Sequence, residues 1–220
     1  MYRRSLDRYR ASRLTCLPLT PSVTKAGRIH DRTLLDALEA LPIEPFNGAA
    51  WRTTWASRDP LGGNFSGGRW DPPGEFEVLY TSLAADGSLA EVYYHLSRAP
   101  VFSSAQVRLT HLRVVIERAL NLTDQNLLQQ LGIEEPLANH LDYSKSQAIG
   151  AAARFLEFQG MLVPSARWPC QNLVLFLDTL DLNHDLAVAK QKDINWPAWR
   201  EQNAATLVSV SDRAGPRVRK

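Results

Sequence analysis

Two stretches dominate the interpretation of this chain: GGRWDPPGEFEVLYTS at residues 67–82 and SLAEVYYH at residues 88–95. The first ends in a run rich in β-branched and aromatic residues, which predicts a buried strand over residues 76–82. Five glycines and three prolines within residues 57–75 predict a long irregular loop before that strand. In the second stretch, a serine followed three residues later by a glutamate predicts a capping box at the start of a helix over residues 88–99.

Further elements are predicted on both sides of these stretches. Leucines at helical spacing predict a helix over residues 31–41, with Asp31 as its N-cap. A longer helix is predicted over residues 144–160, with Ser144 and Gln147 as a second capping pair. A short helix over 122–133 and strands over 49–55, 107–116, 161–165 and 172–178 are also expected, and the rest of the chain is loosely patterned. Because few helices sit between strands as crossovers, this order favours a mixed α+β fold.

The charge of the chain is distributed unevenly. The net charge is +2, but residues 1–30 hold seven basic residues and one acidic residue, and residues 213–220 hold four basic residues and no acidic one. Residues 31–212 hold 14 basic and 22 acidic residues. An acidic body argues against direct nucleic-acid binding, because phosphate contact needs a basic face.

Composition and motifs exclude several other classes. No apolar run reaches the roughly 18 residues of a membrane span, and the basic N-terminus lacks the apolar core of a secretory signal. Two scattered cysteines predict neither a disulfide framework nor a zinc site, so we expect a cytoplasmic protein with no bound metal. The chain has no P-loop, no HExxH and no GxSxG, and its glycine-rich segment is followed by prolines rather than by a helix.

The motifs that remain resemble the RES domain family. GGRWDPPGEFEVLYTS, SLAEVYYH, LVPSAR and QNLVLF follow one another at the spacing of that family, which is named for an arginine, a glutamate and a serine. The resemblance covers about residues 49–180. It implies an ADP-ribosyltransferase-like fold, with a mixed, largely antiparallel sheet core and flanking helices. It also divides the chain into an N-terminal extension, residues 1–45, and an NAD-binding catalytic domain, residues 46–220.

The resemblance implies an activity and the residues that perform it. RES toxins degrade NAD by breaking the bond between nicotinamide and ribose, so NAD is a substrate and no cofactor is expected. The glutamate of the family corresponds to Glu91, which would stabilise the ribosyl cation. The remaining matches are Arg52 and Arg69 for the phosphates, Tyr80 for the nicotinamide, and Ser165 for a polar contact to the substrate or to Glu91. Asn172 is also expected to bind the substrate. Asp71 departs from the family, which usually has Asn after Arg-Trp.

Four of these residues also have a simpler interpretation. Glu91 would serve only as the partner of Ser88 in the capping box, Arg69 would stack on Trp70 at the surface, and Tyr80 would belong to the core. Ser165, after Pro164, would be a turn residue and nothing more.

Several questions stay open at the level of sequence. Water or inorganic phosphate would capture the ribose, and a transferase that attaches ADP-ribose to a protein would use the same cleft. A non-catalytic nucleotide-binding module is a further alternative. The family also implies an antitoxin partner of the Xre type, which carries a helix-turn-helix. The sequence leaves open whether the chain forms a homodimer.

Overall fold

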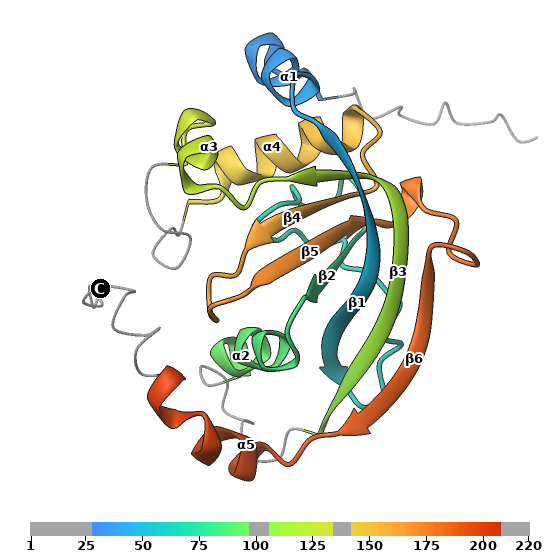
Figure 1. Cartoon of the computed structure of the whole chain (residues 1–220), viewed down its shortest axis with the longest axis vertical. Coiled ribbons are helices and arrows are strands. Elements are labelled where there is room, and N and C mark those ends of the chain that lie inside the picture. Colours follow the sequence, from blue (N-terminus) through green and yellow to red (C-terminus); the bar gives the residue numbers. More distant parts are fainter. Residues whose placement is uncertain (1–27, 97–105, 134–141, 208–220) are drawn as a thin grey trace, which may run out of the picture.

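The computed structural model describes residues 28–96, 106–133 and 142–207. It contains a six-stranded sheet with flanking helices (Figure 1). The strands are β1 Ile43–Trp55, β2 Val78–Ser82, β3 Val107–Asn121, β4 Gly160–Pro164, β5 Gln171–Phe176 and β6 Leu186–Asp193. The helices are α1 Arg32–Glu39, α2 Ala85–Leu96, α3 Gln125–Gln130, α4 Ser144–Phe155 and α5 Trp196–Gln202.

The sheet is largely antiparallel and curls on itself. The strand order is β1-β2-β5-β4-β3-β6, and β1 also pairs with β3 along its whole length. The contact between β1 and β2 is a single pair, Trp51 with Ser82, so the ring of five strands closes only narrowly there. Among the strands of the described residues, β3 with β4 is the only parallel pair. The predicted α+β class with a mixed, largely antiparallel sheet is therefore confirmed.

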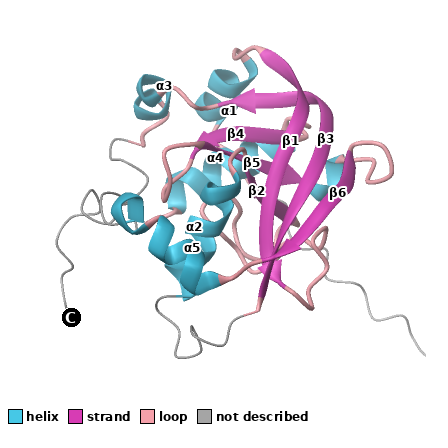
Figure 2. Cartoon of the chain, turned by 60° about the horizontal axis from the view of Figure 1, so that its bottom comes forward, coloured by secondary structure: helices cyan, strands magenta, loops and turns pink. Residues whose placement is uncertain are grey.

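Apolar residues bury the sheet against two groups of helices. The helices α1, α3 and α4 pack near one end of the sheet, and Leu38, Leu128 and Ile149 carry that contact. The helices α2 and α5 lie near the other end, where Trp196 and Trp199 pack with α2 and with the start of β3. The long strands β1, β3 and β6 run side by side, with most of the helices gathered on the other side (Figure 2).

The helix predicted over residues 31–41 is confirmed as α1. The Asp31 carboxylate accepts hydrogen bonds from the backbone N–H groups of Thr33 and Leu34, at 2.7 and 3.3 Å. This is the N-cap role that the sequence predicts. The helix packs on α4, so the described part of the predicted extension contributes to the main core. Residues 1–27 lie outside the described residues, and the division at residue 45 stays a prediction.

Two predicted capping boxes are wrong. The helix α2 begins at Ala85, so Ser88 lies inside it, and its hydroxyl is 2.9 Å from that of Thr53 on β1. The helix α4 begins after Tyr143, with no side-chain cap, because Gln147 donates to a carbonyl of a distant loop instead. In each helix one member of the predicted pair, Ser88 in α2 and Gln147 in α4, makes a tertiary contact that local spacing does not reveal.

The C-terminal part is more regular than the sequence suggests. Strand β6 pairs with β3 along the sheet edge, and α5 follows it, capped by Asn195. Only Leu186 of β6 is buried, so the strand lacks the alternation that would have predicted it. The other predicted strands are present, although β1 begins at residue 43 rather than 49 and β3 extends to residue 121.

Candidate active site

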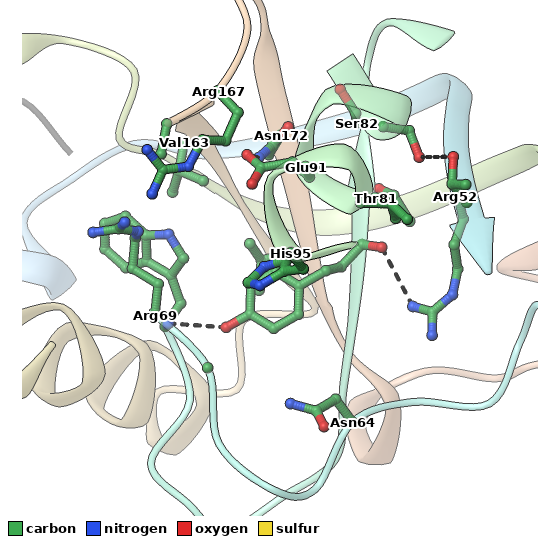
Figure 3. Close-up of a pocket in the computed structure, with 18 of the residues that line it drawn as sticks. Arg52, Asn64, Arg69, Thr81, Ser82, Glu91, His95, Val163, Arg167 and Asn172 are labelled. Carbon is green, nitrogen blue, oxygen red and sulfur yellow. Dashed lines mark hydrogen bonds between the residues drawn. The ribbon is translucent and has the colours of Figure 1, made fainter. Parts of the chain in front are cut away.

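A cavity of about 440 Å³ opens between β1, β2, α2, the irregular segment after β1 and the connection between β4 and β5 (Figure 3). Five of the six residues proposed from the sequence line it: Arg52, Arg69, Tyr80, Glu91 and Asn172. The sixth, Ser165, lies between two lining residues and contacts Glu91 directly. The fold therefore brings together residues that are up to 120 positions apart in the sequence.

Glu91 is held by two side chains, one from β5 and one from the segment after β4. Its Oε1 atom accepts hydrogen bonds from Ser165 Oγ at 3.0 Å and from Asn172 Nδ2 at 3.2 Å. Asn172 lies on β5 directly opposite Val163 of β4, and Ser165 follows β4, so the sheet register fixes the positions of both donors. Two donors on one oxygen orient the carboxylate and stabilise its negative charge.

The segment after β4 is a tight turn that also carries an arginine. The Ser165 hydroxyl accepts a hydrogen bond from the backbone N–H of Arg167 at 3.2 Å while it donates to Glu91. The guanidinium of Arg167 stacks on Tyr94 of α2, with 3.3 Å between its central carbon and the ring centroid. One serine thus positions both the carboxylate and this arginine.

Arg52 of β1 is a buried cation on the other side of the cavity. Its Nη1 and Nη2 atoms donate to the carbonyls of Tyr80 and Gly62, at 3.3 and 2.6 Å, and its Nε has no hydrogen-bond partner among the described residues. Burial lowers its pKa to about 10, and the neighbouring charge of Arg58 contributes. The guanidinium stays charged at neutral pH, so an anion in the cavity would offset the cost of burying it.

Tyr80 forms a buried pair with Asp71. The phenol donates to the carboxylate of Asp71 and accepts from the backbone N–H of Trp70 at 2.9 Å. Burial raises the pKa of Asp71 to about 6, although the Tyr80 hydrogen bond lowers it, and burial also raises the pKa of Tyr80. Asp71 itself does not line the cavity, so its carboxylate lies behind Tyr80 rather than at the cavity surface.

Helix α4 holds the loop that contains Arg69. Gln147 donates to the carbonyl of Gly68 at 2.8 Å, and Ser146 donates to the carbonyl of Arg69 at 2.7 Å. Gly150 lets the helix approach, because a Cβ atom there would lie 1.8 Å from the carbonyl oxygen of Trp70. The Arg69 guanidinium lies 4.5 Å from the ring centroid of Tyr143, just before α4, and not on Trp70 as the surface interpretation supposed.

The sequence did not single out several residues that line the cavity, among them Arg58, Asn64, Tyr94, His95 and Tyr143. Tyr94 and His95 follow Glu91 by three and four residues, so helical periodicity alone places them on the same face of α2. Asn64 and Arg58 fall within the segment predicted to be a functional loop. Nothing in the local sequence around Tyr143 indicates its position in the site.

The family model of the RES domain matches residues 43–200, and the chain belongs to this family. Two curated relatives are named as an NAD(+) phosphorylase and a probable NAD(+) phosphorylase. The NAD(+) phosphorylase MbcT of Mycobacterium tuberculosis (strain H37Rv) is 32% identical over 143 residues, which cover 62% of this chain and 77% of that protein. A probable NAD(+) phosphorylase of the same organism, Rv3189, is 33% identical over 155 residues, covering 67% and 73%.

A solved structure has the same fold. It is the crystal structure of the M. tuberculosis MbcT-MbcA toxin-antitoxin complex, which matches with a TM-score of 0.70 and 28% identity, over 79% of this chain and 98% of that chain. In the described part of this chain, no helix has the length and apolar content needed to cross a membrane.

Proposed function

We propose that the protein is a toxin-type enzyme that degrades NAD by cleaving the bond between nicotinamide and ribose. The observation that carries this proposal is the arrangement around Glu91. Among the described residues that line the cavity there is a single carboxylate, held by Ser165 and Asn172, and the other charged lining residues are arginines, apart from the titratable His95. Membership of the RES family and the names of the phosphorylase relatives support the same function.

The chemistry of the bond explains why one carboxylate is enough. Nicotinamide leaves as a neutral molecule because the pyridinium nitrogen takes up the electron pair of the bond, so no general acid and no resident cofactor are needed. The ribose develops positive charge at its anomeric carbon, as in glycoside cleavage. Glu91 would stabilise that charge, and its two hydrogen-bond donors keep it oriented during the reaction.

The arginines supply the complementary binding. Arg52 and Arg69, on opposite sides of the cavity in Figure 3, are the candidates for the pyrophosphate of NAD. Guanidinium groups suit this role because they bind phosphate oxygens through pairs of hydrogen bonds. Tyr80 would contact the nicotinamide with its ring, because its hydroxyl is already engaged with Asp71.

Nicotinamide release from NAD by the purified protein is the direct test. We expect release by the wild-type chain and a large loss in the Glu91→Gln variant, with the thermal stability of both proteins similar. A folded wild-type protein that releases no nicotinamide would refute the proposal. Tight NAD binding without release would instead identify a non-catalytic nucleotide-binding module.

The fate of the ribosyl group distinguishes the related activities. Free ADP-ribose indicates hydrolysis, ADP-ribose phosphate indicates phosphorolysis, and label from NAD fixed on protein indicates an ADP-ribosyltransferase. We favour degradation of NAD over transfer to protein, because the curated relatives at 32% and 33% identity are named phosphorylases.

An antitoxin partner belongs to the same proposal, because the similar solved structure is a toxin-antitoxin complex. We further propose that the partner is of the Xre type, that the pair acts in the cytoplasm, and that any contact with DNA is made through the partner. Residues 1–45 would serve that contact, shield the cavity or stabilise a homodimer. Expression without the partner is expected to slow growth, and harmless expression of the active protein would contradict this.

A further inference from the structure

The cavity carries more positive charge than NAD alone would balance. Among its lining residues, in the part of the chain that the structure describes, four arginines accompany one carboxylate: Arg52, Arg58, Arg69 and Arg167 with Glu91. NAD brings two negative phosphate charges and one positive pyridinium, which together leave one negative charge. A second, small anion therefore fits the electrostatics of the cavity.

The four arginines fall into two neighbourhoods. Burial lowers the pKa of Arg52 most, and the positive charge of Arg58 is the next largest cause. Burial lowers the pKa of Arg167, while Glu91 raises it and the positive charge of Arg69 lowers it. Figure 3 shows Arg167 and Arg69 on one side of the cavity, with Glu91 beside Arg167, and Arg52 on the other side.

Arg167 is fixed with respect to Glu91 by the turn that holds them both. The Ser165 hydroxyl contacts the Arg167 backbone N–H and the Glu91 carboxylate at the same time. The stacking on Tyr94 orients the guanidinium, and the residue is only 7% exposed. A cation held in this way next to a carboxylate can bring a second anion close to it, which charge repulsion would otherwise prevent.

We propose that Arg167 binds inorganic phosphate as the acceptor of the ribosyl group and so selects phosphorolysis over hydrolysis. This proposal rests on the proposed cleavage of NAD. The bond from the anomeric carbon to the pyridinium nitrogen breaks, and its electron pair stays with nicotinamide. A phosphate oxygen forms the new bond to that carbon, giving ADP-ribose 1″-phosphate, while water in the same position gives ADP-ribose.

The test compares the wild-type protein with Arg167→Gln over a series of inorganic phosphate concentrations. Loss of the charged hydrogen bonds is expected to raise the KM for phosphate roughly 10- to 100-fold, with the KM for NAD changed much less. At fixed phosphate, the product is expected to shift from ADP-ribose 1″-phosphate toward ADP-ribose. A purely structural role for Arg167 would change total turnover and leave the product ratio as it is.

Two further variants control the result. Arg167→Lys keeps the charge and loses the paired hydrogen-bond geometry, so an intermediate KM for phosphate is expected. Arg113→Gln removes an exposed arginine of β3 outside the cavity and is expected to behave as wild type. If Arg167→Gln does not fold, the KM for phosphate and the product ratio of Arg167→Lys are compared with those of the wild type instead.

A binding measurement separates this proposal from the proposed function. Inorganic phosphate alone is expected to raise the melting temperature of the wild-type protein and to have a smaller effect on Arg167→Gln. If NAD is cleaved but the KM for phosphate and the product ratio are the same in both proteins, Arg167 is not the acceptor site. If NAD is not cleaved, an equal phosphate effect on both melting temperatures refutes the acceptor site, and a smaller effect on the variant supports phosphate binding at Arg167.

Discussion

The two walls of the cavity are built in different ways. On one wall, Glu91, Ser165 and Asn172 come from α2, the end of β4 and β5, and the serine and the asparagine each donate to Glu91. A second wall is formed by the irregular loop that contains Arg69, and this loop is held by Tyr80 and by α4. The comparison indicates that a helix and two strands fix the orientation of Glu91. The position of Arg69 depends instead on the contacts that its loop makes with α4 and Tyr80.

The largest expected effect is at the regular wall. Glu91→Gln keeps the size of the side chain and an oxygen that can accept the two hydrogen bonds, but it removes the charge that faces the ribosyl cation. We expect nicotinamide release to fall roughly 100- to 1,000-fold. The measurement is steady-state turnover, with a thermal melt as the check on folding. A variant with wild-type turnover would remove Glu91 from the mechanism.

The second largest effect is expected at the contact between α4 and the loop that contains Arg69. Gly150→Ala places a Cβ atom where the carbonyl oxygen of Trp70 lies, so the loop or the helix must move. We expect a loss of about 1–3 kcal/mol in the free energy of unfolding and a higher KM for NAD. Denaturant unfolding and kinetics measure the two effects. Lys145→Ala, at an exposed position on the same helix, is the control and is expected to change neither.

The buried pair behind the loop predicts a pH dependence. Because the pKa of Asp71 is about 6 in the folded protein and 3.8 in its reference state, the folded chain binds more protons between these values. Stability from this group is therefore present at low pH and is lost as pH rises from about 4 to about 6. The loss is on the order of 3 kcal/mol.

Asp71→Asn tests this dependence because it has no titrating carboxyl. We expect the melting temperature of the wild type, relative to Asp71→Asn, to fall across this pH range and to level off above it. A difference that stays constant from pH 4 to pH 7 would contradict the assignment. The Asn variant also carries the residue that the family resemblance predicts at this position, so its kinetics show whether the carboxylate matters for turnover.

The smallest effect is expected for Gln147→Ala. This change removes one hydrogen bond to the carbonyl of Gly68 and leaves the close packing at Gly150 in place. We expect a loss of about 0.5–1.5 kcal/mol in stability, with a small rise in the KM for NAD. If Gln147→Ala costs more than Gly150→Ala, the loop depends on the hydrogen bond rather than on the packing.

The sequence predicts the regular wall better than the loop wall. The fold class, the helix after Asp31 and the strands around Tyr80 and Asn172 follow from local patterns, and the motif order places Glu91 with Ser165. The contacts of α4 do not follow, because a glutamine, a serine and a glycine on a helix give no local sign of a distant loop. Strand β6 was missed because an edge strand with exposed Lys and Gln residues has no apolar alternation.

The spacing of the residues around Glu91 has a consequence for the order in which the protein becomes active. Its two hydrogen-bond donors follow it by 74 and 81 positions, and the strand before α2 pairs with β5. Chains are made from the N-terminus, so a ribosome that has passed Glu91 but has not reached Ser165 holds the carboxylate without the groups that orient it. The nascent polypeptide cannot form its cavity until β5 has been synthesised, which delays any damage to the nucleotide pool until these late residues have joined the fold.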